Sequence, residues 1–127
     1  MARITGIGGV FFKARDPKAL AAWYAKYLGL VVEDFGGAIL KWPDDTAEDR
    51  GVTVWHLAAS DSTWFHGPQM INYRVDDLDG IIAQAREGGA TDVKGPETHE
   101  NGRFAWVTDP ERNKVELWEP KLWRDKT

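Results

Sequence analysis

The chain has 127 residues, of which 43% are hydrophobic and 28% charged, which fits one compact domain and excludes intrinsic disorder as its main state. Its formal net charge of −4, with no long block of like charges, lacks the basic footprint of a nucleic-acid-binding protein. The absence of cysteine excludes disulfides, thiolate nucleophiles and cysteine-ligated metal sites. The sequence has neither a signal-peptide pattern nor a membrane-length apolar run, so we expect a soluble, cytoplasmic protein.

The first half of the chain predicts one helix among several strands. A β-branched and aromatic run over 7–13 predicts a strand, and Asp16-Pro17 then supplies an N-cap and a proline at the first helical position. The amphipathic stripe of this helix ends at Gly29, a residue suited to a left-handed C-terminal position. The stripe consists of Leu20, Trp23, Tyr24, Tyr27 and Leu28.

Three further strands are expected in this half. The runs 30–35 and 38–42 are rich in strand-forming residues and meet at Gly36-Gly37, a pair typical of a hairpin turn. A polar stretch over 43–51 separates them from a third run at 52–58. The first half therefore has the predicted order β-α-β-β-β.

The second half repeats this order. A strand over 70–75 leads to Asp77 as the N-cap of a helix that ends at Gly88-Gly89. A shift of 61 positions places Asp16 on Asp77 and Lys13 on Arg74. Strands are predicted over 91–94, 103–108 and 114–119, the last two joined by the turn 109–113.

This internal repeat predicts an α+β fold made of two paired βαβββ modules. We expect a single domain over 1–127, with modules over about 4–58 and 70–120, a joint over 59–69 and a short C-terminal tail. The two modules would form a cupped mixed β-sheet with the helices on its outer face. The concave surface of such a cup is a natural site for a small organic molecule.

The chain resembles the vicinal oxygen chelate superfamily, which groups glyoxalases, bleomycin resistance proteins and extradiol dioxygenases. The resemblance covers about residues 4–120. It implies the paired-module fold and a cup that binds small molecules, but it leaves the reaction open. The motifs that carry it are Asp16-Pro17, Trp23-Tyr24, Tyr27-Leu28-Gly29-Leu30, Tyr73-Arg74-Val75-Asp76-Asp77-Leu78 and Asp109-Pro110 followed by Asn113-Lys114-Val115-Glu116-Leu117.

The four positions where metal-binding members of the superfamily place their ligands fall here on Gly9, His56, Met70 and Glu116. Gly9 has no side chain, and the thioether of Met70 is a poor ligand for hard divalent ions. His56, Glu116, Asn72 and waters would then hold a divalent ion such as Zn, Ni, Mn or Fe. An extradiol dioxygenase is disfavoured because both of its histidine positions are lost.

His56 and Glu116 each have two interpretations. Glu116 is a metal ligand or general base, or it forms a salt bridge with Lys13, Lys114 or Arg74. His56 is a ligand or general acid, or a core histidine bonded to a neighbour.

The remaining candidates would shape the cup and the assembly. Lys13 and Arg74 are equivalent by the repeat and would clamp an anionic ligand, or they pair with acidic residues at the rim. Aromatic walls would come from Phe11, Trp106 and Trp118. Contacts with a second subunit are expected from Trp64 and Trp123, so the chain is predicted to form a homodimer.

Two functions compete on this reading. In the first, the protein binds a small organic, anionic ligand in its cup, with a depleted or noncanonical metal site and no certain cofactor. In the alternative, it is a metal-dependent lyase or isomerase of the lactoylglutathione lyase type that uses His56 and Glu116 as catalytic residues.

Overall fold

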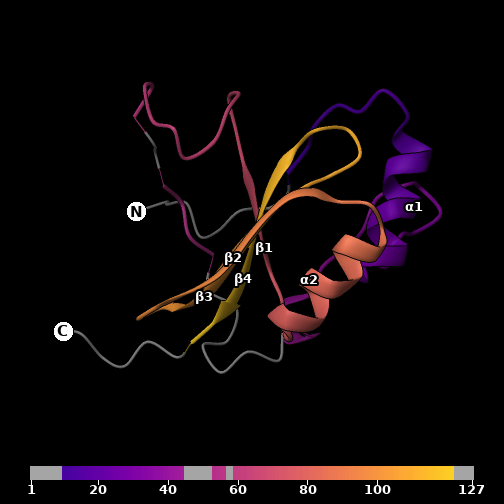
Figure 1. Cartoon of the computed structure of the whole chain (residues 1–127). Helices are drawn as coiled ribbons and strands as arrows, with labels where there is room; N and C mark the ends of the chain where they lie inside the picture. The colour runs from indigo at the N-terminus through magenta and orange to yellow at the C-terminus, as the bar shows by residue number, and fades with distance from the viewer. Residues whose placement is uncertain (1–9, 45–52, 57–58, 122–127) are drawn as a thin grey trace, which may run out of the picture.

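The computed structural model describes residues 10–44, 53–56 and 59–121. These residues form an α+β fold in which both helices lie on the same side of a twisted sheet (Figure 1). In chain order the elements are α1 (Pro17–Leu28), the short 3-10 helix η1 (Trp42–Asp44), β1 (Ile71–Arg74), α2 (Leu78–Glu87), β2 (Thr91–His99), β3 (Gly102–Thr108) and β4 (Lys114–Pro120).

The four strands form one mixed sheet in the order β1-β4-β3-β2. Strand β1 pairs with β4 in parallel, whereas β3 pairs with β4, and β2 with β3, in antiparallel fashion. The parallel pair requires a crossover connection, which α2 begins. The register places Asn72 and Trp106 on either side of Glu116, and Arg74 and Phe104 on either side of Trp118.

Both helices begin and end where the sequence predicts. The side chain of Asp16 accepts a hydrogen bond from the Ala19 amide at 3.0 Å, and Gly29 ends α1 in the left-handed region at φ 71°. The Asp77 side chain caps α2 in the same way, at 3.1 Å from the Gly80 amide. Local capping chemistry therefore fixes the helix boundaries in both halves of the chain.

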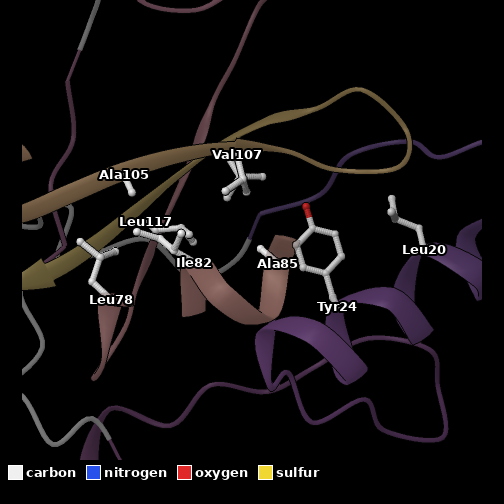
Figure 2. Packing of buried hydrophobic residues seen from close by; sticks show 9 residues of the cluster. Leu20, Tyr24, Leu78, Ile82, Ala85, Ala105, Val107 and Leu117 are labelled. Carbon is white, nitrogen blue, oxygen red and sulfur yellow. The ribbon is translucent and has the colours of Figure 1, made fainter. Parts of the chain in front are cut away.

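The core lies between the sheet and the two helices (Figure 2). Successive strand residues point to opposite faces, and the odd-numbered residues of β3 and β4 face the helices. The core side chains of α2 face the sheet, while those of α1 extend the same cluster at one end. The buried cluster consists of Leu20, Tyr24, Leu78, Ile82, Ala85, Ala105, Val107, Val115 and Leu117.

The turn between β3 and β4 holds α1 against this core. The Glu111 carboxylate accepts hydrogen bonds from the backbone amides of Arg15 and Asp16, both at 3.0 Å. Inside the same turn, the buried Asp109 carboxylate accepts a 2.8 Å hydrogen bond from the Tyr24 hydroxyl. Next to Tyr24 on the same helix, the Trp23 indole donates to the Gly88 carbonyl at 2.7 Å, beside the end of α2.

The strands of the second unit are largely as predicted. Those expected over 70–75, 103–108 and 114–119 appear as β1, β3 and β4 with boundaries shifted by a residue or so. The strand expected over 91–94 is longer, because β2 continues to His99 along β3 with two register shifts.

The strand predictions for the first unit are wrong wherever the structure describes them. Residues 10–13, 30–35, 38–42 and 53–56 form no strand, and the rest of the runs 7–13 and 52–58 lies outside the described residues. The chain does turn at Gly36, where the Glu33 amide donates to the Gly37 carbonyl at 2.7 Å. A strand exists only through pairing with a neighbour, and in this part of the described chain most large apolar side chains are exposed, although Leu30 packs against the core.

The first helix also departs from the paired-module prediction. We expected it to cover a sheet of its own unit, but α1 packs beside α2 and joins the core of the second unit's sheet. The contacts of Glu111 and Asp109 described above explain this position. In the described part of the chain, neither helix has the length and apolar character that a membrane span requires.

The Tyr24–Asp109 contact predicts an alkaline loss of stability. Burial first, and then the neighbouring Tyr73 and Asp109, raise the pKa of Tyr24 above its ordinary value of 10.0. The folded protein therefore holds this proton more tightly than the unfolded chain, so the free energy of unfolding falls as pH rises above about 10. Urea unfolding at about pH 8 and about pH 11 should show a smaller loss in Tyr24→Phe than in the unmodified protein.

At about pH 8, Tyr24→Phe should itself lower the free energy of unfolding by about 1–2 kcal/mol, because Asp109 loses a buried donor. Tyr27→Phe is the matched control, since this half-buried tyrosine lies on the same helix. Equal alkaline losses in all three proteins would contradict the assignment to Tyr24.

Candidate functional site

A cavity of about 1080 Å³ opens on the face of the sheet that the helices leave uncovered. The even-numbered residues of β1, β3 and β4 form its floor, because they alternate with the core residues. The loop 59–69 and the end of β2 supply its sides. The lining consists of Val54, His56, Ala59, Ser60, Ser62, Trp64, Phe65, Gly67, Pro68, Gln69, Met70, Asn72, Glu97, His99, Glu100, Asn101, Phe104, Trp106, Glu116 and Trp118.

Three residues in one row across the sheet form the centre of this floor. The strand register aligns Asn72, Glu116 and Trp106 on β1, β4 and β3. The Asn72 amide donates to Glu116 Oε1 at 2.8 Å, and the Trp106 indole donates to Oε2 at 2.8 Å. Strand pairing therefore positions a carboxylate between two N–H donors on its neighbouring strands.

Trp64 brings a third donor from the loop 59–69. Its indole N–H lies 3.3 Å from Glu116 Oε2, and its ring meets the edge of His56 with the centroids 5.6 Å apart. The Lys114 ammonium donates to the Trp64 carbonyl and lies 6.0 Å from the centre of the Trp106 ring. Trp64 thus joins the loop to the floor of the cavity.

The Glu116 side chain is a buried acid whose recorded donors are all neutral. The residue is 6% exposed, and both of its carboxylate oxygens accept hydrogen bonds. A carboxylate offers only acceptors, which suits these three N–H donors. The neutral N–H groups stabilise this negative charge without cancelling it.

A second row lies two residues further along the strands and is aromatic. Trp118 stacks on Phe104 with ring centroids 5.9 Å apart and 7° between the ring planes. The Trp118 indole donates to the Asn101 carbonyl at 2.9 Å, and the Arg74 guanidinium lies 5.1 Å from the ring centre. This row gives the cavity a flat apolar wall beside the carboxylate.

The structure brings most of the predicted site residues together, but not all. His56, Met70, Asn72, Trp106, Glu116 and Trp118 line the cavity. Phe11 and Arg74 line a smaller neighbouring cavity of about 550 Å³, to which Asn72, His56 and Trp118 also contribute. Lys13 is exposed and lines neither cavity, and Gly9 lies outside the described residues. The predicted cationic clamp is therefore not assembled around the larger cavity.

The donor set of the cavity does not fit a divalent metal ion well. Both oxygens of Glu116 already accept N–H groups, and Met70 offers a thioether that suits soft metals only. Across the described ranges, no group of three or more His, Cys, Asp or Glu side chains is placed to hold an ion. His56 and Glu116 are thus the pair that would have to carry a metal.

Sequence reasoning missed three aromatic contributors, Trp64, Phe65 and Phe104. The sequence predicts Trp64 at a subunit contact, but its indole faces Glu116 across a loop whose path no periodic pattern reveals. The even number of Phe104 on β3 places it on the same face as Trp106. Alternation along 103–108 was the signal that could have identified it.

The three donors to Glu116 should contribute unequally to stability. Trp106→Phe removes a 2.8 Å hydrogen bond to a buried carboxylate and should lower the free energy of unfolding by about 2 kcal/mol. Trp64→Phe removes a longer bond from an exposed loop residue and should cost less than about 1 kcal/mol. Denaturant unfolding of both variants checks this order, and equal losses would contradict the geometry.

The comparisons with known proteins agree with this fold. A family model described as a glyoxalase-like domain matches residues 9–118. No curated protein matches the chain. A glyoxalase/bleomycin resistance protein from Streptomyces sp. CB03234 is 35% identical, but the match spans 39% of this chain and 42% of that protein, with a TM-score of 0.35. That match is too partial to support an argument.

Two solved structures match over nearly the whole chain. The antibiotic binding protein TnmS3 from Streptomyces sp. CB03234 is 20% identical, with 95% of this chain and 100% of that chain covered and a TM-score of 0.60. A glyoxylase/bleomycin resistance protein/dioxygenase domain from Frankia sp. EAN1pec is 13% identical, with 94% and 100% covered and a TM-score of 0.59. With a family model that spans most of its length, the chain belongs to the glyoxalase-like domain family of the vicinal oxygen chelate superfamily.

Proposed function

We propose that this protein binds a small organic ligand with a planar aromatic part in the cavity above Glu116. The observation that carries the proposal is the pairing of a buried carboxylate with a wall of aromatic rings on one open face of the sheet. Ligand sites are typically apolar clefts with a few convergent polar groups. The face above β1, β4 and β3 has this composition.

The size of the cavity supports a ligand larger than a metabolite of a few atoms. Its volume of about 1080 Å³ lies at the upper end of the usual range for drug-sized ligands, about 300–1,000 Å³. The half-buried ring of Phe104, stacked on the buried Trp118, favours a flat partner, since aromatic rings gain energy from offset stacking.

The likeness to an antibiotic binding protein supports the same class of function. TnmS3 shares the fold at 20% identity, a level that says nothing by itself about this chain's ligand. The proposal extends small-molecule binding to this chain because its own cavity has the required lining. Binding here does not rely on a metal ion, given the engaged oxygens of Glu116.

The alternative is a metal-dependent lyase or isomerase of the lactoylglutathione lyase type. One observation favours it, namely that His56 and Glu116 line the same cavity. A bound ion would use the acceptor site that the described donors leave on Glu116 Oε1, or displace the longer contact from Trp64. In that case His56 would serve as the second protein ligand.

Blocking the cavity should abolish ligand binding. Three anthracene probes of different charge, 9-anthracenylmethylamine, 9-anthracenemethanol and 9-anthracenecarboxylate, can be titrated while tryptophan fluorescence is recorded. At least one should bind, and Ala59→Trp should weaken its binding about tenfold or more by filling the cavity. Ala83→Trp, on the exposed side of α2, is the matched control and should leave the affinity unchanged.

The same titration separates the two candidate functions. Chelator-treated protein should bind the probes as tightly as untreated protein, and added Zn²⁺, Ni²⁺ or Mn²⁺ should not raise its melting temperature. Near-stoichiometric metal that is lost in both His56→Ala and Glu116→Ala would contradict metal-free binding and support the lyase or isomerase. Failure of all three probes to bind would contradict ligand binding in this cavity.

We further propose that the chain forms a homodimer. Many large hydrophobic side chains of the described residues stay exposed in the single chain, and a second copy would remove them from water. Most belong to the part before β1, where Phe11 is 91% exposed. The set is Val10, Phe11, Phe12, Val31, Phe35, Ile39, Leu40, Trp42, Val54, Trp55 and Trp64.

Light scattering at micromolar concentration tests this assembly. The mass should be twice the 14.3 kDa of one chain, because a second copy would cover the exposed apolar segments. A mass of 14.3 kDa over the accessible concentration range would contradict the dimer.

A further inference from the structure

We infer that the ligand of this cavity carries a protonated nitrogen group, an amine or amidinium, which donates to Glu116 while the aromatic part lies against the wall. The inference rests on the proposed function and specifies its ligand class. The inferred ligand charge is positive, whereas the sequence predicts an anionic ligand held by Lys13 and Arg74. The reversal follows from where the structure places the charged residues.

Glu116 has acceptor capacity left for a ligand. A carboxylate offers roughly four lone-pair sites, and the donors described here occupy three of them. Oε2 accepts both indoles, whereas Oε1 accepts only the Asn72 amide. One ligand N–H group therefore completes the hydrogen bonding of Oε1.

The charges around the cavity favour a cation. Its described lining includes three carboxylates, those of Glu97, Glu100 and Glu116, and no lysine or arginine. His56 and His99 also line it, and His99 lies 3.2 Å from Glu97. Glu116 is buried, and the attraction between a buried charge and a ligand charge is stronger than the attraction between two charges in bulk water.

Among the described residues, the two cations that contact lining rings are Lys114 and Arg74, and neither lines the larger cavity. Lys114 is tied to the Trp64 carbonyl and lies over Trp106, while Arg74 lies over Trp118 and lines the smaller cavity. Within the described part of the chain, Glu116 is therefore the charged group on the floor of the larger cavity.

The three anthracene probes test the inference, since they share one ring system and differ in charge. 9-Anthracenylmethylamine should bind about tenfold or more tightly than 9-anthracenemethanol, as expected for a hydrogen bond to a charged group. 9-Anthracenecarboxylate should bind most weakly. Isothermal titration calorimetry gives the three dissociation constants.

Glu116→Gln tests whether this residue sets the preference. In the variant, the glutamine oxygen can still accept the two indole N–H groups. The glutamine NH₂ group can donate to the Asn72 side-chain oxygen once the Asn72 amide has rotated to present that oxygen. The variant should lose the preference, so that the dissociation constants of the amine and of 9-anthracenemethanol become similar. Glu87→Gln, on an exposed turn of α2, makes the same change in net charge and should keep the preference.

The outcomes separate this inference from the proposed function. Equal binding of all three probes, or tighter binding of the carboxylate, overturns the cationic ligand but leaves a ligand-binding cavity. A preference for the amine that survives in Glu116→Gln overturns the role of Glu116. Binding of no probe overturns both proposals. The order of affinities in the unmodified protein decides the ligand class even if Glu116→Gln fails to fold.

Discussion

The register of three strands is the constraint on which the site depends. Parallel pairing of β1 with β4 and antiparallel pairing of β4 with β3 place Asn72, Glu116 and Trp106 in one row. A slip of one residue in either pair would turn these side chains into the core and bring Leu117 or Val115 to the cavity. The burial of the odd-numbered residues against the helices therefore also fixes the polar geometry on the opposite face.

The helices leave that opposite face open because the turn 109–113 holds α1 in place. Asp109 accepts the Tyr24 hydroxyl, and Glu111 accepts the two amides that precede α1. These contacts join the first helix to the sheet of the second unit. Both helices thus cover one face of the sheet (Figure 1). The cavity with its aromatic lining lies on the other face.

Sequence patterns predicted the features that depend on nearby residues. The N-cap residues Asp16 and Asp77 indicate where the two helices begin. The acidic residue between two apolar residues in Val115-Glu116-Leu117 indicates a polar position on a core strand. Strand pairing depends on distant residues, so alternation in the first half could not reveal that its described segments stay unpaired. The predicted position of Lys13 failed for the same reason, since it assumed a paired first strand.

The loop residue Trp64 shows a different limit. Its contact with Glu116 joins positions 52 residues apart through a segment without helix or strand, and no periodicity encodes such a path. Composition offered a weak hint, because seven tryptophans in a chain of this length require partners. What the structure adds is that two of these indoles meet at one carboxylate.

That convergence is the central claim, and the indole N–H signals in a nuclear magnetic resonance titration test it directly. On addition of 9-anthracenylmethylamine, the signals of Trp106 and Trp64 should shift together, because both donate to Glu116 beside the ligand. The Trp23 signal should stay in place, since that indole bonds to the Gly88 carbonyl on the helix side. Binding that moves Trp23 but leaves Trp106 and Trp64 unchanged would contradict the account.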